Sequence, residues 1–199
     1  FNLAAKQTII GICFAGVQKL RKKGSRSVEA LPSRLFMKWL SNTAQIQQRN
    51  ELMDRLSADM WQKLRVAGLD AALLKGQGIA LLYGELAILR QSGDIDMWVK
   101  GGFDKVNNYI QNTCPSDDFA YHRFHYNIYK ETEVELHFRP TLMRNLWDNR
   151  KLQKWCDSFA PNSFILTDKG FAVPPASFNR VFILTHIYRH FLFEGVGLR

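Results

Sequence analysis

The stretch Ser92-Gly93-Asp94-Ile95-Asp96-Met97-Trp98-Val99 decides how the middle of the chain folds. Polar and apolar residues alternate from Asp94 onward, which predicts a strand over 94–99. Residues two apart on a strand point to the same face, so Asp94 and Asp96 would stand side by side. Neighbouring carboxylates repel each other unless a cation or a proton lies between them. Their oxygens are also the ligands that hard cations such as Mg²⁺ take, so the stretch predicts a site as well as a strand.

A later stretch with the same alternation is Glu131-Thr132-Glu133-Val134-Glu135-Leu136-His137-Phe138. It predicts a second strand over 132–138, with the odd-numbered residues on one face and an apolar opposite face. One of its glutamates can complete a site of three carboxylates with Asp94 and Asp96. His137 shares a face with Glu135 and can orient a carboxylate. The alternative is a half-exposed strand whose polar face lies in water.

The segment Leu73-Leu74-Lys75-Gly76-Gln77-Gly78 predicts a strand over 71–74, a glycine turn and a short helix over 77–83 that ends at Gly84. Such a turn offers free backbone N–H groups and a positive helix end, which suit a phosphate group. Lys75 adds positive charge. The segment is neither a Walker A loop nor a GxGxxG motif, and a plain strand-to-helix turn is the alternative.

The flanking sequence has mainly helical periodicity. A hairpin with its turn at Lys130-Glu131 is predicted between strands over 119–129 and 132–138, and a short strand over 163–166. Gly68 is predicted to cap the helix before it, and Asn42 or Thr43 to break that helix in two. The helices are expected at 3–22, 33–67, 103–110, 142–159 and 177–193. This order predicts an α+β (mixed α/β) fold, a mixed sheet with flanking N- and C-terminal helices.

Composition excludes several classes of protein. With 46% hydrophobic and 23% charged residues among 199, the chain is neither disordered nor collagen-like. No apolar run approaches the about 18 residues of a membrane span, so no membrane partner is expected. Three cysteines at wide spacings argue against a disulfide framework and favour a reducing cytoplasm.

The net charge of +9 is unevenly distributed. Residues 1–66 hold 12 Lys and Arg against 4 Asp and Glu, whereas the remainder is nearly balanced. Such a basic half can bind nucleic acid. The alternative is a solvated helical surface.

Four short motifs together resemble the uncharacterised nucleotidyltransferase family of the polymerase-beta-like superfamily. They are Leu74-Lys75-Gly76, Tyr83-Gly84, Arg90-Gln91-Ser92-Gly93-Asp94-Ile95-Asp96 and Val134-Glu135-Leu136-His137. The resemblance covers most of the chain, including the stretch from His186 to Arg199, and is strongest over 73–99. It implies transfer of a nucleoside monophosphate from an NTP such as ATP, using Mg²⁺ or Mn²⁺ on three carboxylates.

Carried over to this sequence, the resemblance makes Asp94, Asp96 and Glu135 the catalytic, metal-binding carboxylates. Lys75 and Gly76 occupy the place of the superfamily's glycine-serine phosphate motif. Gln77 stands where a serine is usual, so backbone amides would have to bind the triphosphate.

The remaining substrate-binding expectations concern the segment before the carboxylates. Arg90 would bind triphosphate, or alternatively form a salt bridge to Asp94 or Glu85. Ser92 and Gly93 would make a tight approach to the strand. Because the carboxylates repel one another, Asp96→Asn is expected to leave the metal-free protein at least as stable as the wild type.

The sequence thus predicts a metal-dependent nucleotidyltransferase. Its acceptor is unknown, whether a small molecule, a protein hydroxyl or an RNA end. The alternative is a non-catalytic nucleotide-binding or RNA-binding module on the same fold. The expected division is a helical region over 1–67, a nucleotidyltransferase-like core over 68–170 and a truncated C-terminal helical region over 171–199.

Overall fold

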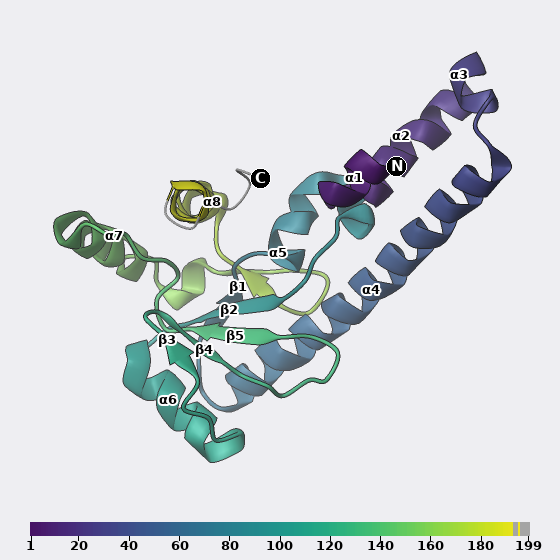
Figure 1. Ribbon diagram of the computed structural model, residues 1–199. Coiled ribbons are helices and arrows are strands. Elements are labelled where there is room, and N and C mark those ends of the chain that lie inside the picture. The colour runs from purple at the N-terminus through teal and green to yellow at the C-terminus, as the bar shows by residue number, and fades with distance from the viewer. Residues whose placement is uncertain (193–194, 196–199) are drawn as a thin grey trace.

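A computed structural model of the chain describes residues 1–192 and 195 (Figure 1). Phe193, the expected last residue of the helix over 177–193, therefore lies outside the described residues, as do residues 194 and 196–199 of the expected C-terminal region. The described part is a mixed α+β fold, as predicted from the order of the elements. None of its helices combines the length and apolar character that a membrane crossing requires.

The central sheet has the strand order β1-β2-β5-β4-β3. β2 pairs in parallel with β5, and the other neighbouring pairs are antiparallel. The strands are β1 (Ala71–Leu73), β2 (Ile95–Val99), β3 (Phe119–Ala120), β4 (Arg123–His125) and β5 (Val134–His137). A separate two-stranded sheet joins β6 (Ile165–Leu166) to β7 (Ala172–Val173), and β7 was not predicted.

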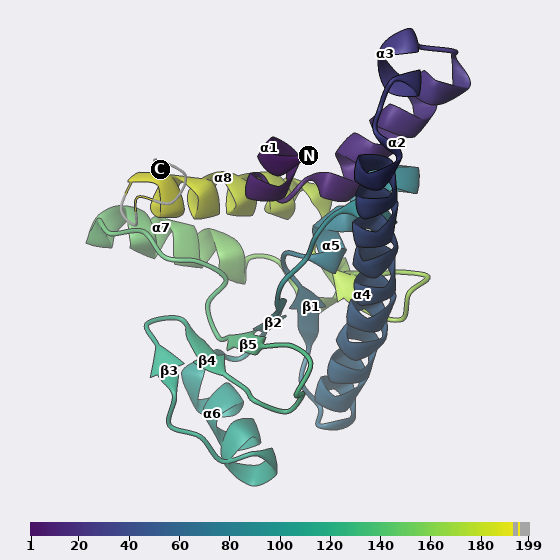
Figure 2. The same cartoon turned by 45° about the vertical axis from the view of Figure 1, so that its right-hand side comes forward.

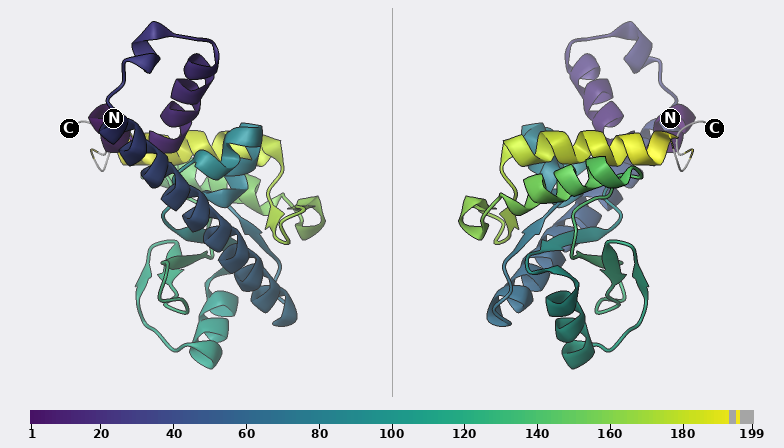
Figure 3. Two further views of the ribbon diagram at one scale, coloured as in Figure 1. Left: turned by 90° about the vertical axis from the view of Figure 1, so that its right-hand side faces the viewer. Right: turned by 90° about the vertical axis from the view of Figure 1, so that its left-hand side faces the viewer.

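Helices cover both faces of the central sheet. They are α1 (Asn2–Lys6), α2 (Ile10–Lys22), α3 (Arg26–Glu29), α4 (Ser33–Val66), α5 (Gln77–Ala80), α6 (Gly102–Thr113), α7 (Leu146–Asp157) and α8 (Ala176–Leu192). Two 3₁₀ segments, η1 (Leu81–Leu89) and η2 (Pro161–Ser163), complete the list of elements. α7 and α8 run beside each other on one side of the sheet, and α6 lies on the other (Figure 3).

The longest helix, α4, runs past the sheet and continues beyond it to meet α2 (Figure 2). It is continuous, so the predicted break at Asn42 or Thr43 is wrong. Both side chains instead donate hydrogen bonds to carbonyls four residues back, which lets the helix pass through them. Gly68, at φ +73°, closes α4 with a left-handed cap as predicted.

Other boundaries differ from the predicted ones. The helix expected over 3–22 is divided at Thr8, whose φ of +53° ends α1 before α2 begins. The segment between the helices expected at 3–22 and 33–67 contains a further short helix, α3. The strand expected over 119–129 is two short strands, and the residues from Tyr126 to Glu133 form a longer connection than the predicted hairpin turn.

The two faces of the sheet pack differently. One face joins α4 and α6 in a core that includes Met53, Leu64, Met97, Val106 and Leu136. On the other face, Trp98 stacks on Phe178 of α8 at a centroid distance of 4.7 Å, beside residues of α7. This second face also carries the polar cluster described next.

Candidate active site

The parallel pairing of β2 with β5 brings the acidic residues of the two strands together. Asp96 is directly opposite Glu135 in the register, and both side chains are buried. Asp94 immediately precedes β2 and remains 39% exposed at its side chain. The alternation predicted for both strands is confirmed, because Ile95, Met97 and Leu136 lie in the opposite core.

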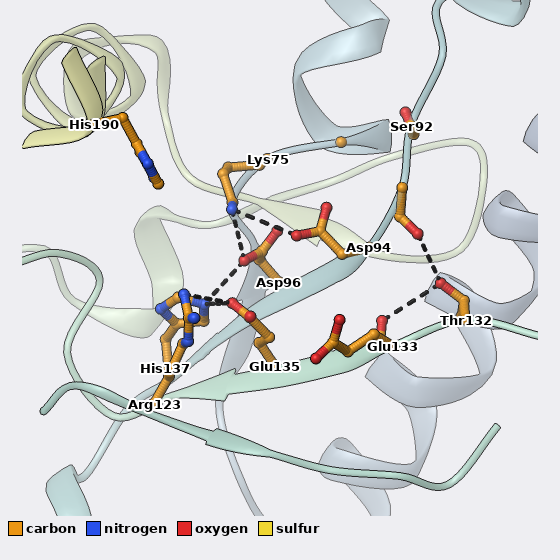
Figure 4. Close-up of polar contacts among 12 residues, drawn as sticks. Lys75, Ser92, Asp94, Asp96, Arg123, Thr132, Glu133, Glu135, His137 and His190 are labelled. Carbon is orange, nitrogen blue, oxygen red and sulfur yellow. Dashed lines mark hydrogen bonds and ion pairs between the residues drawn. The ribbon is translucent and has the colours of Figure 1, made fainter. Parts of the chain in front are cut away.

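Lys75 supplies a cation to both aspartates (Figure 4). Its Nζ lies 2.9 Å from Asp96 Oδ1 and 3.6 Å from Asp94 Oδ2. The backbone fixes this approach, since the N–H of Leu74 donates to the carbonyl of Asp96 at 2.9 Å. Burial alone would lower the pKa of Lys75, but the charges of Asp96 and Asp94 outweigh burial and raise it. Lys75 is therefore charged at neutral pH.

His137 joins the two strands. Its Nε2 lies 3.0 Å from Asp96 Oδ1 and 3.2 Å from Glu135 Oε2. Burial would lower the pKa of His137, yet the hydrogen bonds to these carboxylates raise it above its ordinary value. Burial likewise opposes ionisation of Asp96, but His137 and Lys75 hold its pKa far below the usual range. Lys75 and His137 thus form one compensated charge cluster with Asp96 and Glu135.

Arg123 of β4 adds a third cation at 3.1 Å, measured from its Nη1 to Glu135 Oε2. The residue lies on the same face as Glu135 because it pairs across the strands with His137. Sequence reasoning missed Arg123, since nothing in the sequence gives the register of β4 against β5. His137, in contrast, was signalled by its spacing of two from Glu135.

These built-in cations overturn the expectation for Asp96→Asn in the metal-free protein. The carboxylates do not face one another uncompensated, because Lys75, His137 and Arg123 lie among them. Removing the charge of Asp96 would deprive Lys75 and His137 of a buried ion-pair partner, and leaving buried charges unpaired lowers the free energy of unfolding. The substitution is therefore expected to destabilise the protein without metal.

The donor set fits a divalent cation. Ligand atoms of Asp96, Glu135 and His137 all lie within 4.8 Å of one another. Asp96 Oδ2 is buried and has no hydrogen-bond partner among the described residues. Asp94 lies outside this group of three, but it shares the cation Lys75 with Asp96. Burial, followed by the charge of Asp96, raises the pKa of Asp94, so a cation there would favour its ionised form.

The glycine turn after β1 packs against the loop that leads into β2. Gly76 has φ +54°, and a Cβ at this position would lie 3.2 Å from the carbonyl oxygen of Asp94. Only glycine fits such a close approach in the left-handed region. The turn therefore lies beside Asp94, as a phosphate-binding element next to the carboxylates would.

Arg90 forms neither of the salt bridges considered from the sequence. Its Nη1 donates to the carbonyl of Gly76 at 3.2 Å and to Ser92 Oγ at 2.8 Å. The carbonyl of Gly93 accepts a hydrogen bond from Thr132 Oγ1 at 3.1 Å. Arg90, Ser92 and Gly93 thus connect the glycine turn, the loop before β2 and the segment before β5.

The side chain of Gln77 points away from the carboxylates. It is buried against α4, where Nε2 donates to the carbonyl of Asn50 at 3.1 Å and to Asp54. Only the backbone of Gln77 is left for the role that the resemblance implies.

The chain matches a family model along its whole length. The family is described as an uncharacterised nucleotidyltransferase, and the match spans residues 1–199. No curated protein and no solved structure has a significant similarity to the chain. With this match and a cluster of buried acidic residues at the parallel strand pair, the chain belongs to the uncharacterised nucleotidyltransferase family.

Proposed function

We propose that the protein is a metal-dependent enzyme that moves a nucleoside monophosphate from an NTP such as ATP to an acceptor hydroxyl. The observation that carries the proposal is the register of β2 and β5, which sets Asp96 opposite Glu135. Asp94 precedes β2, is more exposed than Asp96 and Glu135, and lies beside the Gly76 turn. Donor phosphates at the turn would thus be adjacent to the carboxylates.

Asp94, Asp96 and Glu135 would hold Mg²⁺ or Mn²⁺, supported by the buried, unpartnered oxygen of Asp96. When bound, the metal supplies charge neutralisation and polarises phosphate oxygens. The ammonium of Lys75 lies close to both Asp94 and Asp96. If a metal replaced the ammonium at these carboxylates, Lys75 would be released to pair with the triphosphate. His137 and Arg123 hold the carboxylates in position.

The reaction needs one new bond and one broken bond. The acceptor oxygen attacks the α-phosphorus, and the bond from that phosphorus to the pyrophosphate oxygen breaks. The hydroxyl proton passes to Asp96 or Glu135, which act as the base. Lys75, with the backbone amides of Gly76 and Gln77, binds the leaving pyrophosphate. Arg90, Ser92 and Gly93 keep the turn and the carboxylates in register.

Titration calorimetry with ATP tests the proposal. We expect measurable affinity in millimolar Mg²⁺ and a loss of at least tenfold in EDTA. Glu135→Gln should abolish this metal dependence, whereas Glu131→Gln, at an exposed position in the connection before β5, should preserve it. Equal ATP affinity with and without metal would rule out a metal-bridged site and favour a non-catalytic nucleotide-binding module.

We also propose a cytoplasmic location and the division into a core over 68–170 with helical regions at 1–67 and 171–199. Cys13, Cys114 and Cys156 are free thiols, which suits a reducing compartment. α4 packs the N-terminal region on the core, because it shares one apolar cluster with the sheet and another with α2.

A further inference from the structure

A cavity of about 790 Å³ is lined by Arg123 of β4, which contacts Glu135, so the cavity lies on the β4 side of the carboxylates and the glycine turn after β1 lies on the other. It opens between the β3–β4 turn and the ends of α7 and α8. Its size is that of sites for small ligands rather than of a packing defect. The side chains that matter below are Tyr121, His122, Arg123, Arg139, Tyr188 and Arg189.

We propose that this arginine-lined cavity binds the acceptor, and that the acceptor is a small molecule bearing a phosphate group. This inference rests on the proposed nucleotidyl transfer and adds the substrate class. It follows from the cavity's connection to the carboxylates, its charge and its aromatic rim.

One lining residue links the cavity to the carboxylates. Arg123 lines it and also contacts Glu135 at 3.1 Å. The ring of His122, another lining residue, lies 5.2 Å from the ring of His137. In the sheet order, the turn that follows β1 and the cavity beside β4 flank the carboxylates of β2 and β5 from opposite sides. A donor at the turn and an acceptor in the cavity would meet at the carboxylates.

The charge of the cavity selects an anion. Arg123, Arg139, Arg144 and Arg189 line it, and no acidic residue of the described chain does. Among the described residues, the guanidinium of Arg139 has no ion-pair or hydrogen-bond partner. Burial, followed by the charge of His137, lowers the pKa of His122 to about 3, so its ring is a neutral acceptor for Arg189 at 3.1 Å. One guanidinium group can bind two oxygens of a phosphate through parallel hydrogen bonds. A phosphate dianion also balances more positive charge than a carboxylate does.

The rim of the cavity is aromatic. Tyr121, which is 89% exposed, and Tyr188, which is 48% exposed, line it with large rings that can pack against the apolar part of a ligand. They would cover the body of the acceptor while Arg139 holds its phosphate. Its hydroxyl would then point toward Glu135, one of the two carboxylates proposed as the base.

An RNA end fits these observations less well than a small molecule. RNA binding would extend over a continuous basic surface. The densest basic segment, however, is at α2 and α3, at the opposite end of the molecule from β3 and α7 (Figures 1 and 2). The cavity is therefore an isolated basic site of small-molecule size.

Calorimetric titrations with inorganic phosphate, ribose 5-phosphate and ribose test the inference. We expect both phosphates to bind and ribose not to bind. Arg139→Gln should weaken ribose 5-phosphate at least tenfold, whereas Arg150→Gln, an exposed arginine of α7 that does not line the cavity, should change its affinity less than twofold. Unchanged melting temperatures would verify that both variants are folded.

If the wild type shows no Mg²⁺-dependent ATP binding, the proposed function itself is overturned. The acceptor site alone is overturned if ATP binding is intact but the phosphate probes do not bind. The same holds if the probes bind with an affinity that Arg139→Gln does not change. A single-stranded RNA that binds more tightly than ribose 5-phosphate in an Arg139-dependent way would contradict the small-molecule class.

Discussion

The two faces of β2 and β5 are buried to the same degree but are built in opposite ways. On one face, Ile95, Met97 and Leu136 are almost fully buried in the core against α4 and α6. On the other, Asp96 and Glu135 are also buried, and each is held by cations. Burying apolar surface stabilises a fold, whereas burying charges costs free energy that pairing only partly returns. The same strands thus carry stability on one face and a chemically demanding site on the other.

The largest effect is expected on the apolar face, from Leu136→Ala. Leu136 is fully buried beside Glu135, so truncation should cost about 2–5 kcal/mol of the free energy of unfolding. Because the side chain points away from the carboxylates, the loss should be equal in EDTA and in Mg²⁺. Urea melts measure it, with the exposed Leu184→Ala as the matched control expected to change stability by less than about 0.5 kcal/mol. A loss that depends on Mg²⁺ would mean that the two faces are not separable.

On the polar face, His137→Asn should cost somewhat less, about 3 kcal/mol in EDTA near pH 6, because two buried carboxylates lose their shared partner. The pKa of His137 is raised in the folded protein, so its stabilisation is fully present below the unfolded pKa of about 6.5. It is lost as the pH rises through the raised value. The stability difference between wild type and variant should therefore shrink toward alkaline pH.

Urea melts of both proteins from about pH 6 to pH 9 measure this difference. A difference that is constant over the range would show that His137 is neutral in the folded protein. His125→Asn, which alters the more exposed pair with Glu133, is the control.

A smaller effect, about 1–2 kcal/mol in EDTA, is expected for Lys75→Gln, because Lys75 is less deeply buried than His137. Here the metal should compensate. If Mg²⁺ takes the place of the ammonium between Asp94 and Asp96, millimolar Mg²⁺ should restore most of the lost stability. Differential scanning fluorimetry in EDTA and in Mg²⁺ measures the restoration. A deficit unchanged by Mg²⁺ would count against exchange of lysine for metal.

The smallest effect is expected far from the sheet. Lys22, Lys23 and Arg26 are exposed near α3, at the end of the molecule away from the carboxylates (Figure 1). Replacing all three with Gln should change the calorimetric affinity for Mg²⁺ and ATP by less than twofold. A tenfold loss, about 1.4 kcal/mol, would instead assign this basic segment to the nucleotide site.

The sequence predicts the site better than its surroundings, for physical reasons. The period of two in β2 and β5 fixes which side chains share a face, so the pairing of Asp94 with Asp96 and of Glu135 with His137 follows from spacing. The choice of Glu135 among the three glutamates comes instead from the family resemblance. Arg123 follows from neither, because strand register depends on tertiary packing. The orientation of the Gln77 side chain toward α4 could not be predicted either, because it depends on where α4 packs, and the contacted residue of α4 is more than twenty positions away in sequence.

Boundaries depended on local hydrogen bonds that composition does not reveal. Asn42 and Thr43 read as helix breakers, yet each satisfies a carbonyl of the preceding turn within α4. β7 has only two residues, too few for any period to appear.

The most direct test of the central claim is a set of urea melts of wild type and Asp96→Asn, in EDTA and in millimolar Mg²⁺ with ATP. A ligand that binds only the folded state adds about 2.7 kcal/mol at a hundredfold excess over its Kd. We expect the wild type to gain stability of this order. Asp96→Asn should be less stable than wild type in EDTA and gain almost nothing from Mg²⁺ and ATP. Equal gains in both proteins would contradict the assignment of Asp96 as a metal ligand, and with it the proposed site.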